Sequence, residues 1–171
     1  MLIVMAGLPG TGKSTVCREL AKTLPATILD KDKIRAALFP PKKIQYSTEQ
    51  DDFCMKIMLE TAAYLLRKDA AHFVFLDGRP FSRRYQIEEA IATAEELKQP
   101  WRILDCTCSD ETARQRIEAQ AAGGEHLASN RDYALYLRVK TAFEEIIQPK
   151  TIVNTDQPLE ATIPLALNAL R

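Results

Sequence analysis

The sequence has no long hydrophobic run, no excess of charge of one sign and few cysteines. Its apolar stretches are only a handful of residues long, well short of the roughly 20 that a transmembrane helix needs. Because 23 lysines and arginines balance 23 aspartates and glutamates, the chain lacks the bulk positive field that holds long nucleic acids. We therefore expect no membrane partner, do not favour a nucleic acid partner, and expect any basic site to be local.

Four cysteines are too few for a disulfide scaffold, and no CxxC pair has the matching second pair of a zinc site. We expect Cys17, Cys54, Cys106 and Cys108 to be reduced. Cys106 and Cys108 alternate along a predicted strand, where cysteine acts as a small hydrophobe; a redox pair is the alternative. The start "MLIVMAG" lacks the charged leader and cleavage pattern of a signal peptide, so we expect a cytoplasmic protein.

What is present is the pattern of a single α/β domain. With 171 residues, 46% of them hydrophobic, the chain suits one domain with a sizeable core and is short for two. Apolar runs of strand length occur at residues 2–6, 26–29, 73–76, 102–106 and 151–153. Helical spacing occurs at residues 13–24, 47–68, 82–97, 110–122, 132–147 and 159–170. This alternation predicts an α/β fold with a parallel sheet and helices on both faces.

The stretch "MAGLPGTGKSTV", residues 5–16, carries the most specific motif. It fits G-x-x-x-x-G-K-[ST] and lies between an apolar strand and a helix. Glycines let backbone N–H groups wrap around a phosphate, and the helix that follows adds its positive end. The residues expected to bind the nucleotide are Gly7, Pro9, Gly10, Thr11, Gly12, Lys13, Ser14 and Thr15. Lys13 would reach the β- and γ-phosphates and Ser14 would bind Mg²⁺; a glycine-rich turn without a ligand is the alternative.

The turn with this motif is a P-loop, and other segments of the chain separate the classes of protein that carry one. A GTPase needs N-K-x-D after a late strand, where this chain has "NTDQ" at residues 154–157. Its D-x-x-G switch would fall on "DGRP" at residues 77–80, which ends in proline. ATPases that do mechanical work or form rings are usually longer. A small kinase is the class that remains.

The second strand runs into "LDKDKIR", residues 29–35. Asp32 and Arg35 would share one face of a short helix at the carboxyl edge of the sheet, where open α/β folds bind ligands. A carboxylate there can accept the proton of an attacking hydroxyl, and an arginine can hold an anionic group of the acceptor. The alternative is that Asp30 or Asp32 caps the helix and that Arg35 is solvated.

Together, "GLPGTGKST" and "LDKDKIR" resemble the P-loop kinases that include polynucleotide 5′-hydroxyl kinase, adenylylsulfate kinase and zeta-toxin-type kinases. The resemblance spans nearly the whole chain. It implies a three-layer P-loop kinase fold whose five-stranded parallel sheet has the order 2-3-1-4-5. It also implies that Asp32 is the catalytic base and that Arg35 binds the acceptor.

Asp77 ends the third predicted strand, within "HFVFLDGRPFSRRYQ", the position from which a carboxylate holds Mg²⁺. Similar kinases carry an arginine in the loop after this aspartate, which implies acceptor contacts for Arg79, Arg83 or Arg84. The alternative for Asp77 is an ordinary cap at the end of a strand, and for the arginines it is exposed surface charge.

A lid is expected over residues 114–132. In small kinases the helix after the fourth strand leads into a lid whose arginines neutralise the charge on the transferred phosphate. Arg114 and Arg116 are about 200° apart around a helix, so at most one faces the nucleotide, and we favour Arg116. Related kinases often place a further arginine where this chain has Gln120; Arg131 could supply that charge.

The sequence therefore predicts an ATP- and Mg²⁺-dependent kinase, a phosphotransferase with an alcohol group as acceptor, in a single domain over residues 1–171. Its catalytic candidates are Lys13, Asp32 and Arg116, its acceptor-binding candidates Arg35, Arg79 and Arg83, and its metal-binding candidates Ser14 and Asp77. The favoured acceptor is a small molecule, and a polynucleotide 5′-hydroxyl is the alternative. A non-catalytic nucleotide-binding regulatory protein is the alternative from another class. No oligomeric state is predicted.

Overall fold

The strands that the sequence predicts form one parallel sheet. A computed structural model describes residues 1–123 and 132–171, and within these residues the sheet has five strands in the order β2-β3-β1-β4-β5. The strands are β1 (Leu2–Ala6), β2 (Ala26–Asp30), β3 (Phe73–Asp77), β4 (Trp101–Thr107) and β5 (Thr151–Asn154). The structure thus confirms the α/β class and the strand order 2-3-1-4-5.

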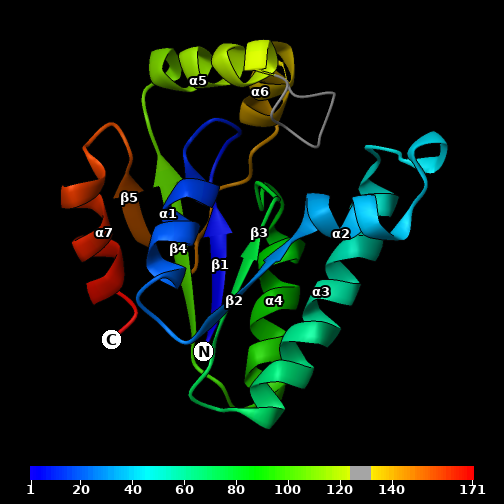
Figure 1. Cartoon of the computed structure of the whole chain (residues 1–171), viewed down its shortest axis with the longest axis vertical. Helices are drawn as coiled ribbons and strands as arrows, with labels where there is room; N and C mark the ends of the chain where they lie inside the picture. The colour runs from blue at the N-terminus through cyan, green and yellow to red at the C-terminus, as the bar shows by residue number, and fades with distance from the viewer. Residues whose placement is uncertain (124–131) are drawn as a thin grey trace.

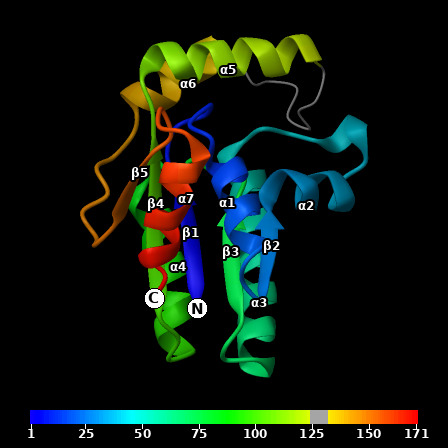
Figure 2. The same ribbon diagram turned by 60° about the vertical axis from the view of Figure 1, so that its left-hand side comes forward.

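The helices form a layer on each face of this sheet (Figure 1). They are α1 (Lys13–Ala21), α2 (Lys31–Leu38), α3 (Thr48–Lys68), α4 (Arg84–Glu96), α5 (Asp110–Gly123), α6 (Tyr133–Thr141) and α7 (Leu159–Asn168), with a 3-10 turn over Pro41–Lys43. Helices α1 and α7 cover one face, and α3 and α4 cover the other (Figure 1 and Figure 2). Helices α5 and α6 lie across the carboxyl ends of the strands in both views.

The central strand is buried on both sides, which explains its continuous apolar sequence. Leu2 and Val4 pack toward α3 and α4, whereas Ile3 and Met5 pack toward α1 and α7. Alternate side chains of a strand point to opposite faces, so a parallel strand between two helical layers must be apolar throughout. The loops at the carboxyl ends of the strands are therefore held on a rigid support.

Side-chain caps fix where several helices begin. Asp30 accepts hydrogen bonds from backbone N–H groups at the start of α2, and Ser47 accepts one from Gln50 at the start of α3. Asp132 does the same for α6 by accepting from Leu135. Such caps satisfy N–H groups that have no partner inside the helix. Because Asp30 is also the last residue of β2, α2 begins directly at the edge of the sheet.

The predicted helix over residues 132–147 is too long. Helix α6 ends at Thr141, and the chain then continues without helix, with Glu144 N–H donating to Ser82 O at 2.9 Å. Phe143 and Ile146 pack into the core beneath α3 and α4. Their spacing resembles that of a helix face, although they reach the core from an irregular segment.

Cys17, Cys54 and Cys106 behave as expected, whereas Cys108 does not lie on the strand that was expected to carry it. All four are free, and Cys17, Cys54 and Cys106 are buried. Burial raises the pKa of Cys106 to about 12, so this thiol stays protonated among the apolar side chains around it. Cys108 is half-buried just beyond the end of β4.

Helices long and apolar enough to cross a membrane are not found within residues 1–123 and 132–171.

Candidate functional site

The turn after β1 can be built only with glycine at its tightest points. Gly7 has a φ of 127°, and a Cβ at this position would lie 2.2 Å from the carbonyl oxygen of Cys106. Gly10 has a φ of 80°, and its Cβ would lie 2.8 Å from the carbonyl oxygen of Ala113 in α5. Positive φ is unfavourable for residues with a side chain. The spacing of glycines in the sequence therefore reflects both backbone conformation and close packing.

Lys13 begins α1 and folds back over this turn. Its ammonium donates to the carbonyl oxygens of Gly7, at 2.8 Å, and Leu8, at 2.7 Å, and the side chain is buried. The helix has Gly12 at its N-cap, without a side-chain hydrogen bond at that end. Backbone N–H groups at a helix start, together with a nearby ammonium, suit a phosphate group. Ser14 and Thr15 follow in the first turn, both half-buried.

Asp77 lies at the end of β3, in register with Asp30 at the end of β2. It is 2% exposed, and its Oδ1 has no hydrogen-bond partner among the described residues. Burial, and after it the charge of Asp77, raises the pKa of Asp30. Two neighbouring carboxylates at low exposure repel one another. A cation at this edge would relieve that repulsion.

The residues present fit Mg²⁺ bound through a small number of protein oxygens. Mg²⁺ prefers oxygen ligands and is commonly held by one or two protein groups together with phosphate oxygens. An orphaned, buried carboxylate oxygen on Asp77 meets that requirement, and Ser14 supplies a hydroxyl in the first turn of α1. Among the described residues, no group of three or more His, Cys, Asp or Glu could hold a metal ion.

Helix α2 brings Asp32 and Arg35 onto one face, as their spacing predicts. Asp30, not Asp32, caps the helix, accepting from Asp32 N–H at 2.9 Å and Lys33 N–H at 3.3 Å. The Asp32 carboxylate is partly exposed and accepts a hydrogen bond from Arg35 Nη1 at 3.0 Å. Lys31 Nζ lies 3.5 Å from the same oxygen, Oδ1.

Three buried cations gather beside Asp32. Lys31, Arg35 and Arg79 are 6%, 2% and 3% exposed. The N-terminal part of α3 supplies carboxylate partners: Asp51 contacts both Lys31, at 3.0 Å, and Arg35. Asp52 accepts from Arg79 Nη2 at 2.6 Å. Buried charges are expensive unless they are paired, so these contacts explain how the cations are tolerated.

These cations line a cavity of about 150 Å³. The residues around it are Pro9, Lys13, Lys31, Asp32, Arg35, Tyr46, Asp51, Gly78, Arg79, Pro80, Leu135 and Val139. The cavity therefore joins the glycine turn to the start of α2 and to the loop after β3. Lys13, Asp32, Arg35 and Arg79, each predicted from the sequence to be a site residue, come together here.

Arg83 and Arg84 are placed elsewhere. Arg83 is half-exposed and pairs with Glu144 at 3.2 Å, and its backbone begins α4. The backbone N–H of Arg84 donates to the same carboxylate at 2.8 Å. Of the three arginines expected to contact an acceptor, the structure brings only Arg79 to the cavity.

Helix α5 turns Arg116 toward the glycine turn. The guanidinium donates to Thr155 Oγ1 at 3.0 Å and Thr155 O at 2.8 Å, and its Nη1 also donates to Gly10 O at 3.4 Å. Arg114, two residues earlier, is exposed and pairs with Glu118 at 2.8 Å. Gln120 has a buried Oε1 with no hydrogen-bond partner in the described chain. Arg131 and the last part of the expected lid, residues 124–131, lie outside the described residues.

Sequence reasoning missed Lys31, Asp51, Asp52 and Tyr46. Acidic residues near the start of α3 are what the helix dipole alone would favour, so Asp51 and Asp52 gave no separate signal. Lys31 is one of many lysines in the chain, and its burial depends on the fold. Tyr46 stacks over the Arg35 guanidinium at 5.2 Å. The signal that could have found the carboxylates is indirect: if Arg35 is buried, it needs partners.

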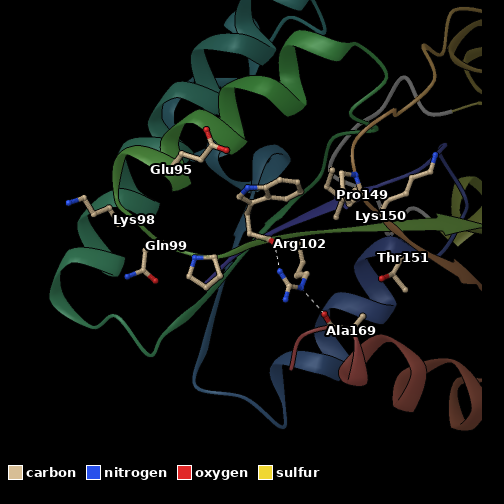
Figure 3. Close-up of a pocket in the computed structure, with 11 residues that line it drawn as sticks. Glu95, Lys98, Gln99, Arg102, Pro149, Lys150, Thr151 and Ala169 are labelled. Carbon is tan, nitrogen blue, oxygen red and sulfur yellow. Dashed lines mark hydrogen bonds between the residues drawn. The ribbon is translucent and has the colours of Figure 1, made fainter.

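A larger hollow, of about 720 Å³, lies at the opposite end of the sheet (Figure 3). It is lined by the start of β4 and the end of α4, and there Arg102 donates to Ala169 O at 3.0 Å. Lys150 on its rim pairs with Asp105 at 3.3 Å. Ligands of parallel α/β sheets bind beyond the carboxyl ends of the strands, so the smaller cavity is the candidate site.

Comparison with protein families gives a match between residues 2–146 and the AAA domain family. No curated protein matches the chain significantly in sequence.

Solved structures match over the whole chain. A gluconokinase from Sinorhizobium meliloti 1021 has a TM-score of 0.70 at 17% identity, covering 99% of this chain and 90% of that one. APS kinase CysC from Mycobacterium tuberculosis, in complex with AMPPNP and APS, gives 0.70 at 18%, covering 99% and 96%. Kti12 from Chaetomium thermophilum, in complex with ADP-AlF3, gives 0.71 at 16%, covering 100% of both chains. At these identities the likeness shows the fold.

Proposed function

The chain belongs to the AAA domain family, and from this premise we propose that it is a kinase that transfers the γ-phosphate of ATP to a hydroxyl group of a small-molecule acceptor. Its fold is that of a small P-loop kinase. The observation that carries the proposal is the shared cavity: Lys13 of the glycine turn and Asp32 of α2 line the same space.

In this proposal the glycine turn binds the triphosphate. Backbone N–H groups of the turn and the start of α1 surround the β-phosphate. Lys13 exchanges its hydrogen bonds to Gly7 and Leu8 for the β- and γ-phosphates. Pro9, Thr11, Ser14 and Thr15 belong to the same loop and first helical turn.

Ser14 and Asp77 are proposed to hold Mg²⁺, Ser14 through its hydroxyl and Asp77 through its unpartnered oxygen. When bound, Mg²⁺ would supply positive charge that neutralises charge on the transferred group. Asp77 is buried among strand ends, so its position is set before any ligand arrives.

Asp32 is proposed to accept the proton of the acceptor hydroxyl. Arg35 and Lys31 both approach its Oδ1, at 3.0 and 3.5 Å, which orients the carboxylate and leaves Oδ2 for the hydroxyl. A positioned base of this kind contributes about 10²–10⁴-fold to a rate. Arg35 and Arg79 are proposed to bind the acceptor, and Arg116 to bind the nucleotide from the side of Thr155.

The test is phosphoryl transfer from Mg·ATP to a panel of hydroxyl compounds, followed by ADP formation and product mass. Asp32→Asn should reduce transfer by about 10²–10⁴-fold and leave ATP affinity unchanged. Lys13→Ala should abolish transfer because it removes the phosphate-binding ammonium. Lys33→Ala is the matched control, since Lys33 is exposed on the same helix as Asp32.

Two results would contradict the proposal. Full transfer by Asp32→Asn would remove that residue from the mechanism. Tight ATP binding without transfer to any hydroxyl would instead indicate a regulatory nucleotide-binding protein.

A further inference from the structure

The cavity beside Asp32 is lined by charged and apolar side chains that come from different elements. Lys31, Asp32 and Arg35 line it from α2, which begins at the edge of the sheet. Leu135 and Val139 line it from α6, which lies across the carboxyl ends of the strands (Figure 1 and Figure 2). The charged residues thus approach the cavity from the edge of the sheet, and the apolar pair approaches it from the helix beyond that edge.

The core of the protein does not account for this apolar pair. Leu135 and Val139 are four residues apart, so they lie on one face of α6. Both are half-buried, and neither belongs to the apolar core clusters of the described residues. Tyr136, the next residue after Leu135, is instead buried against Ala113 and Ile117. Helix α6 therefore packs on the protein through one face and presents another apolar face to the cavity.

Tyr46 adds an aromatic ring to the same cavity. The Arg35 guanidinium lies over this ring, 5.2 Å from its centre. Tyr46 belongs to the connection between α2 and α3, which is fixed by the buried side chain of Gln50. The Gln50 amide accepts from Gln45 N–H at 2.7 Å and donates to Lys43 O at 3.1 Å. The ring is therefore held beside the cavity by hydrogen bonds within the fold.

Resting on the kinase function proposed above, we propose that the acceptor is an alcohol with an apolar face, and that Tyr46, Leu135 and Val139 determine which alcohols are used. We call these three residues the apolar wall. The acceptor oxygen bonds to the γ-phosphorus as the bond from that phosphorus to ADP breaks, and the hydroxyl proton passes to Asp32. Carbon atoms of the acceptor contact the apolar wall, because covering apolar surface is favourable.

The size and lining of the cavity narrow the class of acceptor. A cavity of about 150 Å³ is comparable to one that holds a benzene-sized molecule, so the part of the acceptor that enters it is compact. A polyol with a hydroxyl on every carbon would place hydroxyl groups against Leu135 and Val139, whose side chains offer no hydrogen bond. Such a loss of hydrogen bonds is unfavourable. Branched or cyclic alcohols with hydroxyl groups on one edge fit better.

A binding experiment tests the apolar wall without any chemical step. The protein is saturated with Mg²⁺ and a non-hydrolysable ATP analogue and is then titrated, by ligand-observed NMR, with 3-methylbutane-1,2-diol or with erythritol. The two compounds are similar in size, but erythritol has a hydroxyl on every carbon. Burial of one methyl group is worth about fourfold in affinity, so the branched diol should bind at least tenfold more tightly. Equal or tighter binding of erythritol, or failure of the diol to bind, would overturn the inference.

Variants locate the contact. Leu135→Gln and Tyr46→Gln replace apolar surface by amides, and each should reduce the preference for the branched diol at least threefold, whereas Tyr46→Phe keeps the ring and should retain it. Leu137→Gln is the matched control, because Leu137 is 47% exposed on the same helix and does not line the cavity. Unfolding temperatures establish that each variant is folded. An unchanged preference in both Leu135→Gln and Tyr46→Gln would refute the assignment.

Transfer assays separate this inference from the kinase proposal. The parent protein should use 3-methylbutane-1,2-diol with a kcat/KM at least tenfold above that for erythritol, and Leu135→Gln should act mainly by raising KM for the diol. Transfer that favours erythritol would refute the apolar wall and leave the kinase intact. Absence of transfer to every hydroxyl compound, with the binding preference present, would refute the kinase and leave the apolar wall as a ligand-binding surface.

Discussion

Lys31 shows how burial and charge compete at a single residue. Burial lowers the pKa of this ammonium to about 8; the nearby Asp32 opposes the shift, and Arg35 and Arg79 reinforce it. The side chain is 6% exposed and contacts Asp51 at 3.0 Å. Below pH 8 this lysine is charged although its burial disfavours the charge. An anionic ligand nearby would offset that unfavourable free energy.

The pKa of Lys31 predicts how stability depends on pH. Between pH 8 and 10.5, the unfolded chain keeps the lysine proton that the folded protein has released, so the free energy of unfolding rises with pH in this window. In Lys31→Met this contribution is absent. The difference in unfolding free energy, parent minus variant, should therefore increase by up to about 3 kcal/mol from pH 7 to pH 11.

Urea unfolding at several pH values measures this difference. Lys33→Met is the matched control, because Lys33 is exposed on the same helix and does not line the cavity. A constant difference for Lys31→Met would show that Lys31 titrates as a normal lysine.

The glycines of the turn make separable predictions because their surroundings differ. Gly12→Ala meets no atom closer than 3.5 Å, so its cost is mainly that of positive φ, about 1–2 kcal/mol. Gly7→Ala adds a Cβ 2.2 Å from the backbone oxygen of Cys106, which cannot move aside as a flexible side chain would. Gly7→Ala should lower the free energy of unfolding clearly more, as measured by denaturant titration. Equal losses for the two variants would contradict the close approach.

The site residues that could be predicted from the sequence are those whose partners lie close to them in the chain. Gly7, Gly12 and Lys13 belong to one motif, and Asp32 and Arg35 share a helical turn, so spacing alone relates them. Lys31 needs Asp51, 20 residues away in the chain, and Arg79 needs Asp52, 27 residues away. Such pairs form only when α2, α3 and the loop after β3 are packed together, so no local sequence pattern predicts them.

At the scale of elements, α5 presents two arginines to different surroundings. Arg116 donates to Thr155 and Gly10, so it links the helix to the glycine turn and to the loop after β5. Arg114 pairs with Glu118 on the exposed side of the same helix and lies over the ring of Tyr133. The helical period of 3.6 residues separates them in this way.

This arrangement predicts different effects of the two arginines on nucleotide binding. Arg116→Ala removes a guanidinium that contacts the glycine turn, and we expect the affinity for ATP to fall about tenfold, the equivalent of about 1.4 kcal/mol. Arg114→Ala should leave it unchanged. Calorimetric titration with Mg·ATP measures both. If Arg116→Ala instead lowers kcat and leaves the ATP affinity unchanged, Arg116 acts on the γ-phosphate during transfer. To reach that phosphate, its guanidinium would have to break its hydrogen bonds to Thr155.

Strands were easier to predict than the ends of helices. Strands β1 and β3 are continuous apolar runs because both of their faces are buried. Helix α6 was predicted to extend to residue 147, but it ends at Thr141. Phe143 and Ile146 keep a helical spacing for a different reason, because both fill the core beneath α3 and α4. The apolar spacing of Phe143 and Ile146 therefore reflects tertiary packing, and from the sequence alone it could not be told apart from the spacing of a helix.

At the scale of the whole molecule, the glycine turn is joined to several distant parts of the fold. Gly7 N–H donates to Pro80 O, beyond β3, at 3.1 Å. Thr155, after β5, donates through its hydroxyl to Thr11 O at 2.9 Å. The turn therefore depends on both halves of the sheet, and a ligand bound there should stabilise the domain as one unit.

Thermal unfolding tests this coupling and the single-domain prediction together. One transition is expected, because the sheet and both helical layers share a continuous framework of strands. Mg·ADP at about 100 times its Kd adds about 2.7 kcal/mol of stability, which for a chain of this size raises the unfolding temperature by about 5–10 °C. Lys13→Ala should show little of this rise at the same nucleotide concentration. A second transition that does not move with nucleotide would reveal a part of the chain that folds independently, contrary to the single domain over residues 1–171.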